Sequence, residues 1–162
     1  MNKIIFVVLD NIRSKENVGS IFRTSDAVGV GKIYLCGITP KPLVSQTRYI
    51  YQKGPVDKIS KAALGAEKYM PWEYCKQTWR ILKKLKKEGV QIIALEQAKD
   101  AVNYKKFRPK FPFALILGNE VKGLSKDILK YADRVIKIPM YGKKESLNVA
   151  VAFGIAVYQI GT

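Results

Sequence analysis

Short apolar runs, separated by polar or amphipathic stretches, recur along the whole chain. Runs that are apolar throughout are typical of parallel strands covered on both faces. The stretch from about Asn17 to Val28 lies between two such runs and carries Val18, Ile21 and Ala27 on its core face, so it completes a strand–helix–strand unit. The pattern therefore predicts an α/β fold, an open, mostly parallel sheet with flanking helices. The strands are expected at residues 3–9, 32–36, 91–95, 113–117 and 134–138.

Three further helices are predicted around this sheet. A short helix is expected over residues 58–64, another over 126–131 with Ser125 as its cap, and an amphipathic helix from Pro71 to Gly89. The outer face of the amphipathic helix carries lysines that either remain solvated or contact a polyanion. Its apolar positions are Trp72, Cys75, Trp79, Leu82 and Leu85, and the outer lysines are Lys83, Lys84, Lys86 and Lys87.

The C-terminal stretch joins the end of a strand to a helix of small and apolar residues. Pro139 cannot donate to a sheet ladder, so the last strand ends before it. A helix is expected from Ser146 to Tyr158, capped by Ser146, apolar on most faces and therefore buried. Ser146 and Asn148 place polar side chains at the mouth of this helix. They are either plain caps or part of a binding site for a polar ligand.

Charge narrows the class of partner. Lysine and arginine number 29 against 13 aspartate and glutamate, which gives a formal net charge of +16. A surplus of this size favours a polyanionic partner, and nucleic acid is favoured over a membrane surface because no basic amphipathic helix with exposed aromatic residues stands out. The sequence contains no histidine, which excludes histidine triads, histidine metal sites and imidazole acid–base chemistry.

Length and cysteine content indicate the number of domains, the absence of an expected metal site and the expected cellular location. The 162 residues predict one domain, residues 1–162, with a core of its own. Cys36 and Cys75 show neither metal-ligand spacing nor a disulfide framework, so no metal is expected. The apolar run from Ile4 to Leu9 is too short for a signal peptide or a membrane span. A cytoplasmic location is therefore expected.

The region from Gly37 to about Met70 is long, irregular and basic. Loops of this length in a domain are usually functional or mobile. Tyr49 and Tyr51 lie among basic residues, where they either stack on unpaired bases or pack on the edge of the domain. The basic residues here are Lys41, Arg48, Lys53, Lys58 and Lys61.

Polar residues follow three of the predicted strands, at residues 17–23, 118–123 and 139–148. In an open α/β sheet, ligands bind beyond the carboxyl ends of the strands. Gly118 and Gly123 bracket Asn119 and Glu120, which suits a tight turn whose backbone approaches a ligand. A phosphate-binding loop does not fit, because Gly31-Lys32 lacks the following Ser or Thr and Asp26 stands where the first glycine should be. The dinucleotide fingerprint does not fit either, because Gly29 and Gly31 follow the first helix instead of opening it.

Together these stretches identify a resemblance. The chain resembles the SpoU/TrmH family of RNA ribose 2′-O-methyltransferases, within the SPOUT superfamily. The matching stretches are residues 17–30, 117–124, 138–140 and 146–149. Ala150 stands where the family often has a serine, and the N-terminal extension with which larger members grip RNA is absent, so the identity of the RNA is open.

The resemblance implies an α/β knot, in which the C-terminal segment threads through a loop, and a homodimer formed through terminal helices. It also implies S-adenosylmethionine as the cofactor. Carried onto this chain, the cofactor-binding residues would be Leu95, Glu96, Leu117, Gly118, Ile138, Met140, Ser146 and Leu147.

The family's chemistry suggests Asn17, Arg23, Glu120, Ser146 and Asn148 as catalytic residues. Family accounts propose the residue that matches Arg23 as the base. A guanidinium stays protonated in proteins, so we prefer Arg23 as a clamp on the adjoining phosphate and a stabiliser of the developing alkoxide. Glu120 would orient Arg23 or receive the proton through water, and Asn17 and Asn148 would fix orientations.

Three alternatives stay open at this stage. The compact chain favours tRNA as the substrate over ribosomal RNA, because some minimal family members act on tRNA. A catalytically inactive RNA-binding protein of the same fold would explain the charge equally well, but not the joint presence of the five polar residues. A SPOUT enzyme that methylates a base nitrogen fits the three motifs less well.

Overall fold

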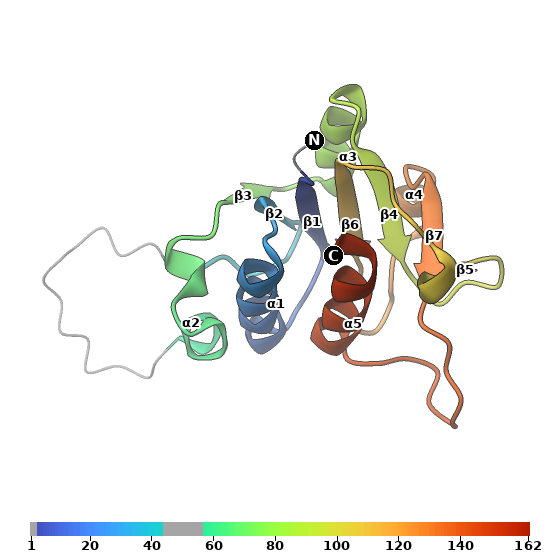
Figure 1. Ribbon diagram of the computed structural model, residues 1–162. Helices are drawn as coiled ribbons and strands as arrows, with labels where there is room; N and C mark the ends of the chain where they lie inside the picture. The colour runs from blue at the N-terminus through green and yellow to red at the C-terminus, as the bar shows by residue number, and fades with distance from the viewer. Residues whose placement is uncertain (1–2, 44–56) are drawn as a thin grey trace, which may run out of the picture.

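Seven strands form a single sheet in the computed structural model, which describes residues 3–43 and 57–162. The strand order is β3-β2-β1-β6-β4-β7-β5, and every neighbouring pair is parallel (Figure 1). The α/β class predicted from the sequence is therefore confirmed. The strands are β1 (Ile5–Asp10), β2 (Lys32–Cys36), β3 (Trp72–Cys75), β4 (Gln91–Leu95), β5 (Val102–Asn103), β6 (Phe113–Leu117) and β7 (Arg134–Lys137).

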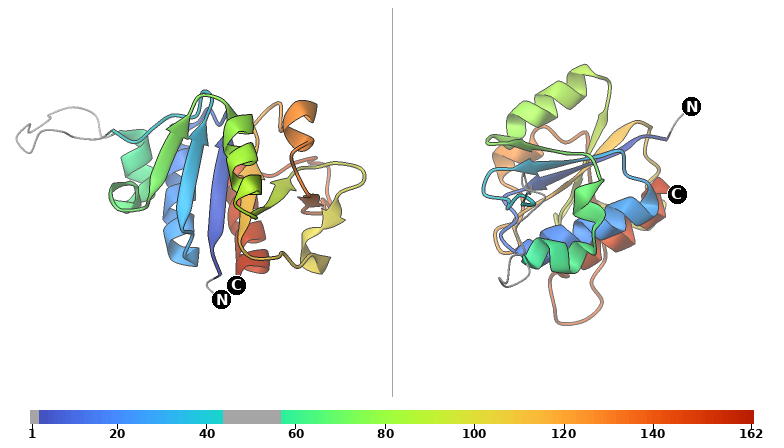
Figure 2. Two further views of the ribbon diagram at one scale, coloured as in Figure 1. Left: turned by 90° about the horizontal axis from the view of Figure 1, so that it is seen from above. Right: turned by 90° about the vertical axis from the view of Figure 1, so that its left-hand side faces the viewer.

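Helices cover both faces of the sheet, and the right-hand view of Figure 2 shows α1, α2 and α5 on one side and α3 and α4 on the other. Successive strand residues point to opposite faces, so Val7 of β1 packs toward α1 and α5 while Val8 packs toward α3. Phe22 and Phe153 are fully buried in the first of these two cores. The helices are α1 (Lys15–Val28), α2 (Lys58–Ala63), α3 (Thr78–Lys87), α4 (Lys126–Leu129) and α5 (Val149–Gly161), with 3-10 turns η1 (Ala66–Lys68) and η2 (Tyr104–Lys106).

The helix predicted from Pro71 is wrong over its first half. Trp72–Cys75 is strand β3, which pairs with β2, and α3 begins only at Thr78. The spacing of Trp72 and Cys75 fits a helix, which repeats about every 3.6 residues. A segment of four residues is, however, too short to distinguish a helix from a strand at the edge of a sheet. Trp79, expected on the apolar face, is 38% exposed, while Leu82 and Leu85 are buried as predicted.

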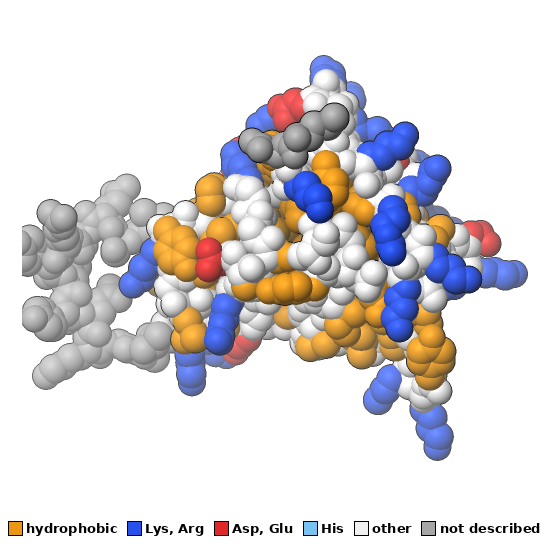
Figure 3. All heavy atoms as spheres, in the orientation of Figure 1, with side chains coloured by type: hydrophobic (Ala, Val, Ile, Leu, Met, Phe, Trp, Pro, Cys, Tyr) orange, Lys and Arg blue, Asp and Glu red, His pale blue; other side chains and the backbone are white. Residues whose placement is uncertain are grey.

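The last helix begins later than predicted, and a different residue caps it. Asn148 is the cap of α5: its Oδ1 accepts from the amides of Ala150 at 2.9 Å and Val151 at 3.3 Å. Ser146 lies before the helix and is exposed. The helix is buried on one side only, because Val151, Ile155 and Tyr158 are 52%, 38% and 47% exposed. Figure 3 shows hydrophobic side chains gathered along α5 on this face, with lysine and arginine side chains around them.

Part of the basic loop lies outside the described residues, including Arg48, Tyr49, Tyr51 and Lys53. The short helix predicted from Lys58 is confirmed as α2, and Ser125 caps α4 as predicted. Across residues 3–43 and 57–162, no helix is both long and apolar enough to span a lipid bilayer.

Close packing of α1 on α2 depends on Gly19. A methyl group at this position would overlap the carbonyl oxygen of Ile59 and lie 2.8 Å from the Cβ of Ala62. We expect Gly19→Ala to lower the free energy of unfolding by about 1–3 kcal/mol, because backbone must shift to admit the methyl group. Thermal unfolding checks this value.

The matched control is Gly154→Ala in α5, where the nearest atom to the new methyl would be the Cγ2 of Thr24 at an ordinary 3.8 Å. Alanine has the higher helix propensity, so this variant should be unchanged or more stable by up to about 1 kcal/mol. Equal effects of the two substitutions would contradict the assignment of close packing to Gly19.

Candidate functional site

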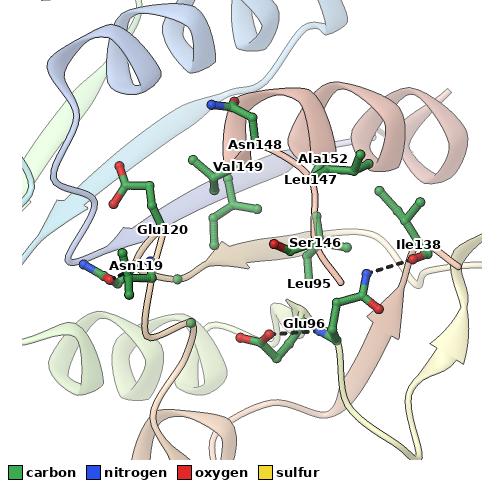
Figure 4. A pocket seen from close by; sticks show the side chains of 15 residues that line it. Leu95, Glu96, Asn119, Glu120, Ile138, Ser146, Leu147, Asn148, Val149 and Ala152 are labelled. Carbon is green, nitrogen blue, oxygen red and sulfur yellow. Dashed lines mark hydrogen bonds between the residues drawn. The ribbon is translucent and has the colours of Figure 1, made fainter. Parts of the chain in front are cut away.

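A pocket opens where β4, β6 and β7 end, and the segment that leads into α5 closes its other side (Figure 4). The sheet register places Leu95 beside both Leu117 and Ile136, so the three chain segments leave the sheet at one edge. The lining residues are Leu95, Glu96, Gln97, Leu117, Gly118, Asn119, Glu120, Val121, Gly123, Ile138, Ser146, Leu147, Asn148, Val149 and Ala152.

The β6–α4 loop folds back on itself directly after the strand. The amide of Gly123 donates to the carbonyl of Asn119 at 2.9 Å, and the side-chain oxygen of Asn119 accepts from the amides of Val121 and Lys122. A Cβ at Gly118 would lie 2.5 Å from the backbone of Gly123, so only glycine permits this close approach. The expected tight turn between the two glycines is confirmed.

Glu96 ties the end of β4 to this loop. Its carboxylate accepts from the amide of Leu124 at 2.8 Å and from the amide of Gln97 at 2.9 Å. Gln97 in turn donates through Nε2 to the carbonyl of Ile138 at 2.8 Å, as Figure 4 shows. Two adjacent polar residues thus hold all three strand ends together and fix the pocket's floor.

A hydrogen-bonded relay of three side chains crosses the top of the pocket. Glu120 Oε1 accepts from Nδ2 of Asn17 at 3.1 Å, and Asn17 Oδ1 accepts from Nδ2 of Asn148 at 3.0 Å. Glu120 also accepts from the backbone amides of Arg13 and Ser14 at 2.9–3.1 Å. The relay joins the β6–α4 loop to the first turns of α1 and α5.

Hydrogen bonding decides the ionisation of Glu120. Partial burial raises the pKa of its carboxyl, but the amides of Ser14 and Arg13, together with the Asn17 side chain, outweigh burial and hold the pKa below its usual value. Glu120 is therefore a carboxylate at neutral pH, and it is an orienting acceptor before it is a proton acceptor.

The structure brings most of the residues suggested from the sequence together. Leu95, Glu96, Leu117, Gly118, Ile138, Ser146 and Leu147 line the pocket, as do Glu120 and Asn148, and Asn17 reaches it through the relay. Met140 is half-buried outside the lining, and Arg23 lies on the exposed side of α1, away from the lining. The bonds of Glu120 go to Arg13, Ser14 and Asn17 and not to Arg23.

Sequence reasoning missed several members of the site. Gln97 follows β4 and carries a bond that only the folded chain reveals, because its partner Ile138 is 41 positions away. Val149 and Ala152 lie in the first turn of α5; Val149 belongs to the matching stretch 146–149, but neither residue is among the expected binding residues. Asn119 and Gly123 lie in the turn that was expected to approach a ligand, although neither is among the expected cofactor-binding residues.

Comparison with known proteins identifies the protein family of this chain. The model of the SpoU rRNA Methylase family matches residues 4–158, which is nearly the whole chain. The chain belongs to the SpoU methylase family. This membership confirms the resemblance found in the sequence and the enzyme class, an RNA methyltransferase, that it implies.

Individual SpoU relatives agree over nearly the full chain. A tRNA (guanosine(18)-2'-O)-methyltransferase of Aquifex aeolicus is 35% identical over 97% of this chain and 68% of its own length. The AdoMet-bound rRNA methyltransferase of Sinorhizobium meliloti superposes with a TM-score of 0.84 at 28% identity, over 98% of this chain and 56% of that one. The chain spans 57% of the length of the putative TrmH family methyltransferase YacO of Bacillus subtilis.

Another solved structure has nearly the length of this SpoU chain. That structure was solved to explain the 2-OH methylation of C/U34 on tRNA. Its sequence is 25% identical to this chain, and the two structures superpose with a TM-score of 0.77. The match covers 97% of this chain and 93% of that one.

The bonds of Glu120 predict a pH-dependent contribution to stability. In Glu120→Gln, an amide group faces backbone donors that need an acceptor, so the free energy of unfolding at neutral pH should fall by about 1 kcal/mol. Folding lowers the pKa of Glu120, so the wild-type advantage is complete above the usual value of 4.5 and is lost as pH falls through the folded pKa.

Urea unfolding of both proteins at neutral and acid pH measures this difference. Glu145→Gln is the control, because Glu145 is exposed in the loop before Ser146. A difference between wild type and Glu120→Gln that persists unchanged into acid would contradict the assignment.

Proposed function

We propose that this chain transfers the methyl group of S-adenosylmethionine to a ribose 2′-hydroxyl of RNA, with tRNA as the preferred substrate. The observation that carries the proposal is the pocket at the ends of β4, β6 and β7, crossed by the Glu120–Asn17–Asn148 relay in a SpoU chain. The cofactor supplies an electrophilic methyl group on a sulfonium centre when bound.

The pocket suits a cofactor with an apolar ring and polar ends. Leu117, Ile138 and Ala152 give it an apolar floor, while Ser146, Asn148 and Gln97 place polar groups around the opening. Gly123 keeps the loop close: a Cβ there would lie 2.5 Å from Oε2 of Glu96. The Sinorhizobium meliloti relative, whose structure is AdoMet-bound, supports this assignment. Leu95, Glu96, Gly118 and Leu147 would complete the contacts, with Met140 at the margin.

The protein's task is to align a ribose hydroxyl, stabilise it as it loses its proton and exclude water. The sequence contains no histidine, and Glu120 has its acceptor capacity directed at amides. We assign Asn148 and Ser146, at the pocket's mouth, to orient the ribose, with Asn17 holding Asn148 in place. Arg23 would bind the adjoining phosphate and stabilise the developing alkoxide.

Arg23 lies outside the pocket of its own chain, which favours a dimer in which it serves the partner's pocket. Leu147, Val151, Ile155 and Tyr158 leave an apolar surface along α5, beside the pocket. A homodimer that buries this surface would bring α1 of one chain near the pocket of the other, since α1 packs beside α5. The exposed apolar residues are the support for this assembly.

Two further features belong to the same proposal. The segment from Pro139 to Asn148 would thread through a loop of the chain as a C-terminal knot, supported by its contacts with strand ends distant in sequence. Residues 1–162 would act as one catalytic domain, and the reaction would take place in the cytoplasm. The preference for tRNA rests on the Aquifex aeolicus relative and on the tRNA-methylating protein of similar length.

The experiment that tests the reaction uses labelled S-adenosylmethionine and total RNA that lacks native modifications. After the RNA is separated by size and digested, label should appear in a 2′-O-methylated nucleoside of the tRNA fraction. Asn148→Ala should lower kcat by about 10²-fold, the usual cost of losing one group that acts at the transition state. Label in ribosomal RNA would replace the tRNA assignment, and cofactor binding without label in any RNA would favour an inactive RNA-binding protein.

Mixing two defective variants tests the shared site. Arg23→Ala and Asn148→Ala should each retain about a hundredth of wild-type activity alone, but a mixed dimer holds one site with both residues intact. Random exchange of subunits should therefore restore about a quarter of wild-type activity. Analytical ultracentrifugation confirms the dimer, and no recovery in a fully exchanged mixture would place Arg23 in its own chain's site.

A further inference from the structure

A second hollow lies beside the pocket, on the α3 and α4 side of the sheet. It is a groove with a cavity volume of about 860 Å³, built on the residues that follow β1, β2 and β3. Asn119, Val121 and Gly123 line both hollows, so the β6–α4 loop is the wall between them. Val121 is 80% exposed and stands on this wall.

The groove is cationic. Arg13, Lys76 and Lys122 line it with exposed side chains, and none of the three forms an ion pair with a described residue. Asp10 is the one acidic residue among the described residues of the lining. It is only 4% exposed, and its carboxylate accepts a hydrogen bond from the Thr78 hydroxyl, so it presents little charge to a ligand.

An aromatic ring stands at the end of this groove. Trp79, on the first turn of α3, lines the groove and also the two shallow hollows next to it. Cations flank the indole: the guanidinium carbon of Arg80 lies 5.5 Å and Nζ of Lys83 lies 5.7 Å from the ring. Trp79 is 38% exposed, and an accessible indole among cations suits a stacking platform for bases.

We propose that this groove binds single-stranded RNA next to the methylated nucleotide, with an unpaired base stacked on Trp79 and phosphates on Arg13, Lys76 and Lys122. The proposal rests on the proposed function, because it assigns the path of that enzyme's substrate. The groove begins at the wall of the pocket, so an RNA strand whose ribose reaches the pocket can continue into the groove. The net charge of +16 supplies the complementary attraction.

Unpaired bases are the feature that distinguishes single-stranded RNA from other polyanions as a ligand for this groove. Cations alone would suit any phosphate-rich surface, whereas an accessible indole beside them adds affinity only for a ligand with a planar π face. The groove lies across the sheet from α1 and α5, so a dimer formed through α5 leaves it open.

The test uses Trp79 as its own reporter. The chain has two tryptophans, and Trp72→Phe leaves Trp79 as the only fluorophore of its kind. Titration of this variant with a short unstructured oligoribonucleotide should quench and saturate the fluorescence, because a base stacks on the indole. In the otherwise wild-type chain, Trp79→Ala should raise the Kd for the same oligonucleotide about tenfold, and Trp79→Phe should raise it less.

Matched lysine variants distinguish RNA binding in the groove from attraction by the net charge of the protein. Lys122→Gln should lower the slope of log Kd against log salt by about 0.7, the value for one lost contact with a single strand. Lys110→Gln, which removes the same charge next to the opposite, amino-terminal edge of β6, should leave the slope nearly unchanged. Thermal unfolding verifies that every variant is folded.

The outcomes distinguish this inference from the function on which it rests. If the wild type methylates RNA but oligonucleotides do not quench Trp79, or Trp79→Ala and Lys122→Gln bind as the wild type does, the groove assignment is wrong and the methyltransferase stands. Equal effects of Lys122→Gln and Lys110→Gln would also overturn it, since binding would then follow net charge alone. If the wild type neither methylates nor binds RNA, both proposals fall.

Discussion

Backbone groups that leave a parallel sheet together at one edge need new hydrogen-bond partners, and this need governs the site. A buried amide without an acceptor costs about 1–3 kcal/mol, so the part-buried amides of Ser14 and Leu124 need acceptors nearby. Glu96 accepts from the amides of Gln97 and Leu124, and Glu120 accepts from the amides of Arg13 and Ser14. Beyond the ends of the strands, these two side-chain carboxylates thus replace backbone carbonyl groups as hydrogen-bond acceptors.

The pocket follows from that arrangement. The segments after β4, β6 and β7 line one side of the pocket, and Ser146 and Leu147 line the other. Glycine at positions 118 and 123 then permits the close backbone approach on which the floor depends. The function we propose therefore uses a space created by the requirements of folding.

The sequence predicted those parts of the fold that depend on local composition. Continuous apolar runs located the strands from Gln91 to Leu95 and from Phe113 to Leu117, because a parallel strand is buried on both faces along its length. The sequence pattern did not locate β3 or the two-residue β5, because both are too short to show a hydrophobic period. The α5 cap was misassigned because Ser146 and Asn148 are both good capping residues.

The residues of the site were predictable through the family resemblance, but most of their contacts were not. Gly118, Ser146 and Asn148 belong to the stretches that match the family, whereas the relay joins Asn17 to residues 103 and 131 positions away. No spacing along a chain reveals a contact of that kind, because it depends on the order of strands in the sheet. The same reason hid the place of Arg23, which has the sequence context of the site but lies on an exposed helix face.

The net charge indicates the class of partner, and the positions of the acidic residues in the fold show where the excess of cations is presented. Asp10 is buried against Thr78, Glu96 and Glu120 accept from backbone amides, and Glu73 and Asp133 pair with lysines. Much of the chain's small acidic complement is thus engaged in holding the fold, and the cations that line the groove have few opposing charges. An unstructured chain of this composition would attract RNA without direction. The folded chain places Arg13, Lys76 and Lys122 in one groove, on the far side of the β6–α4 loop from the pocket, and this is the direction in which we propose that the RNA strand continues.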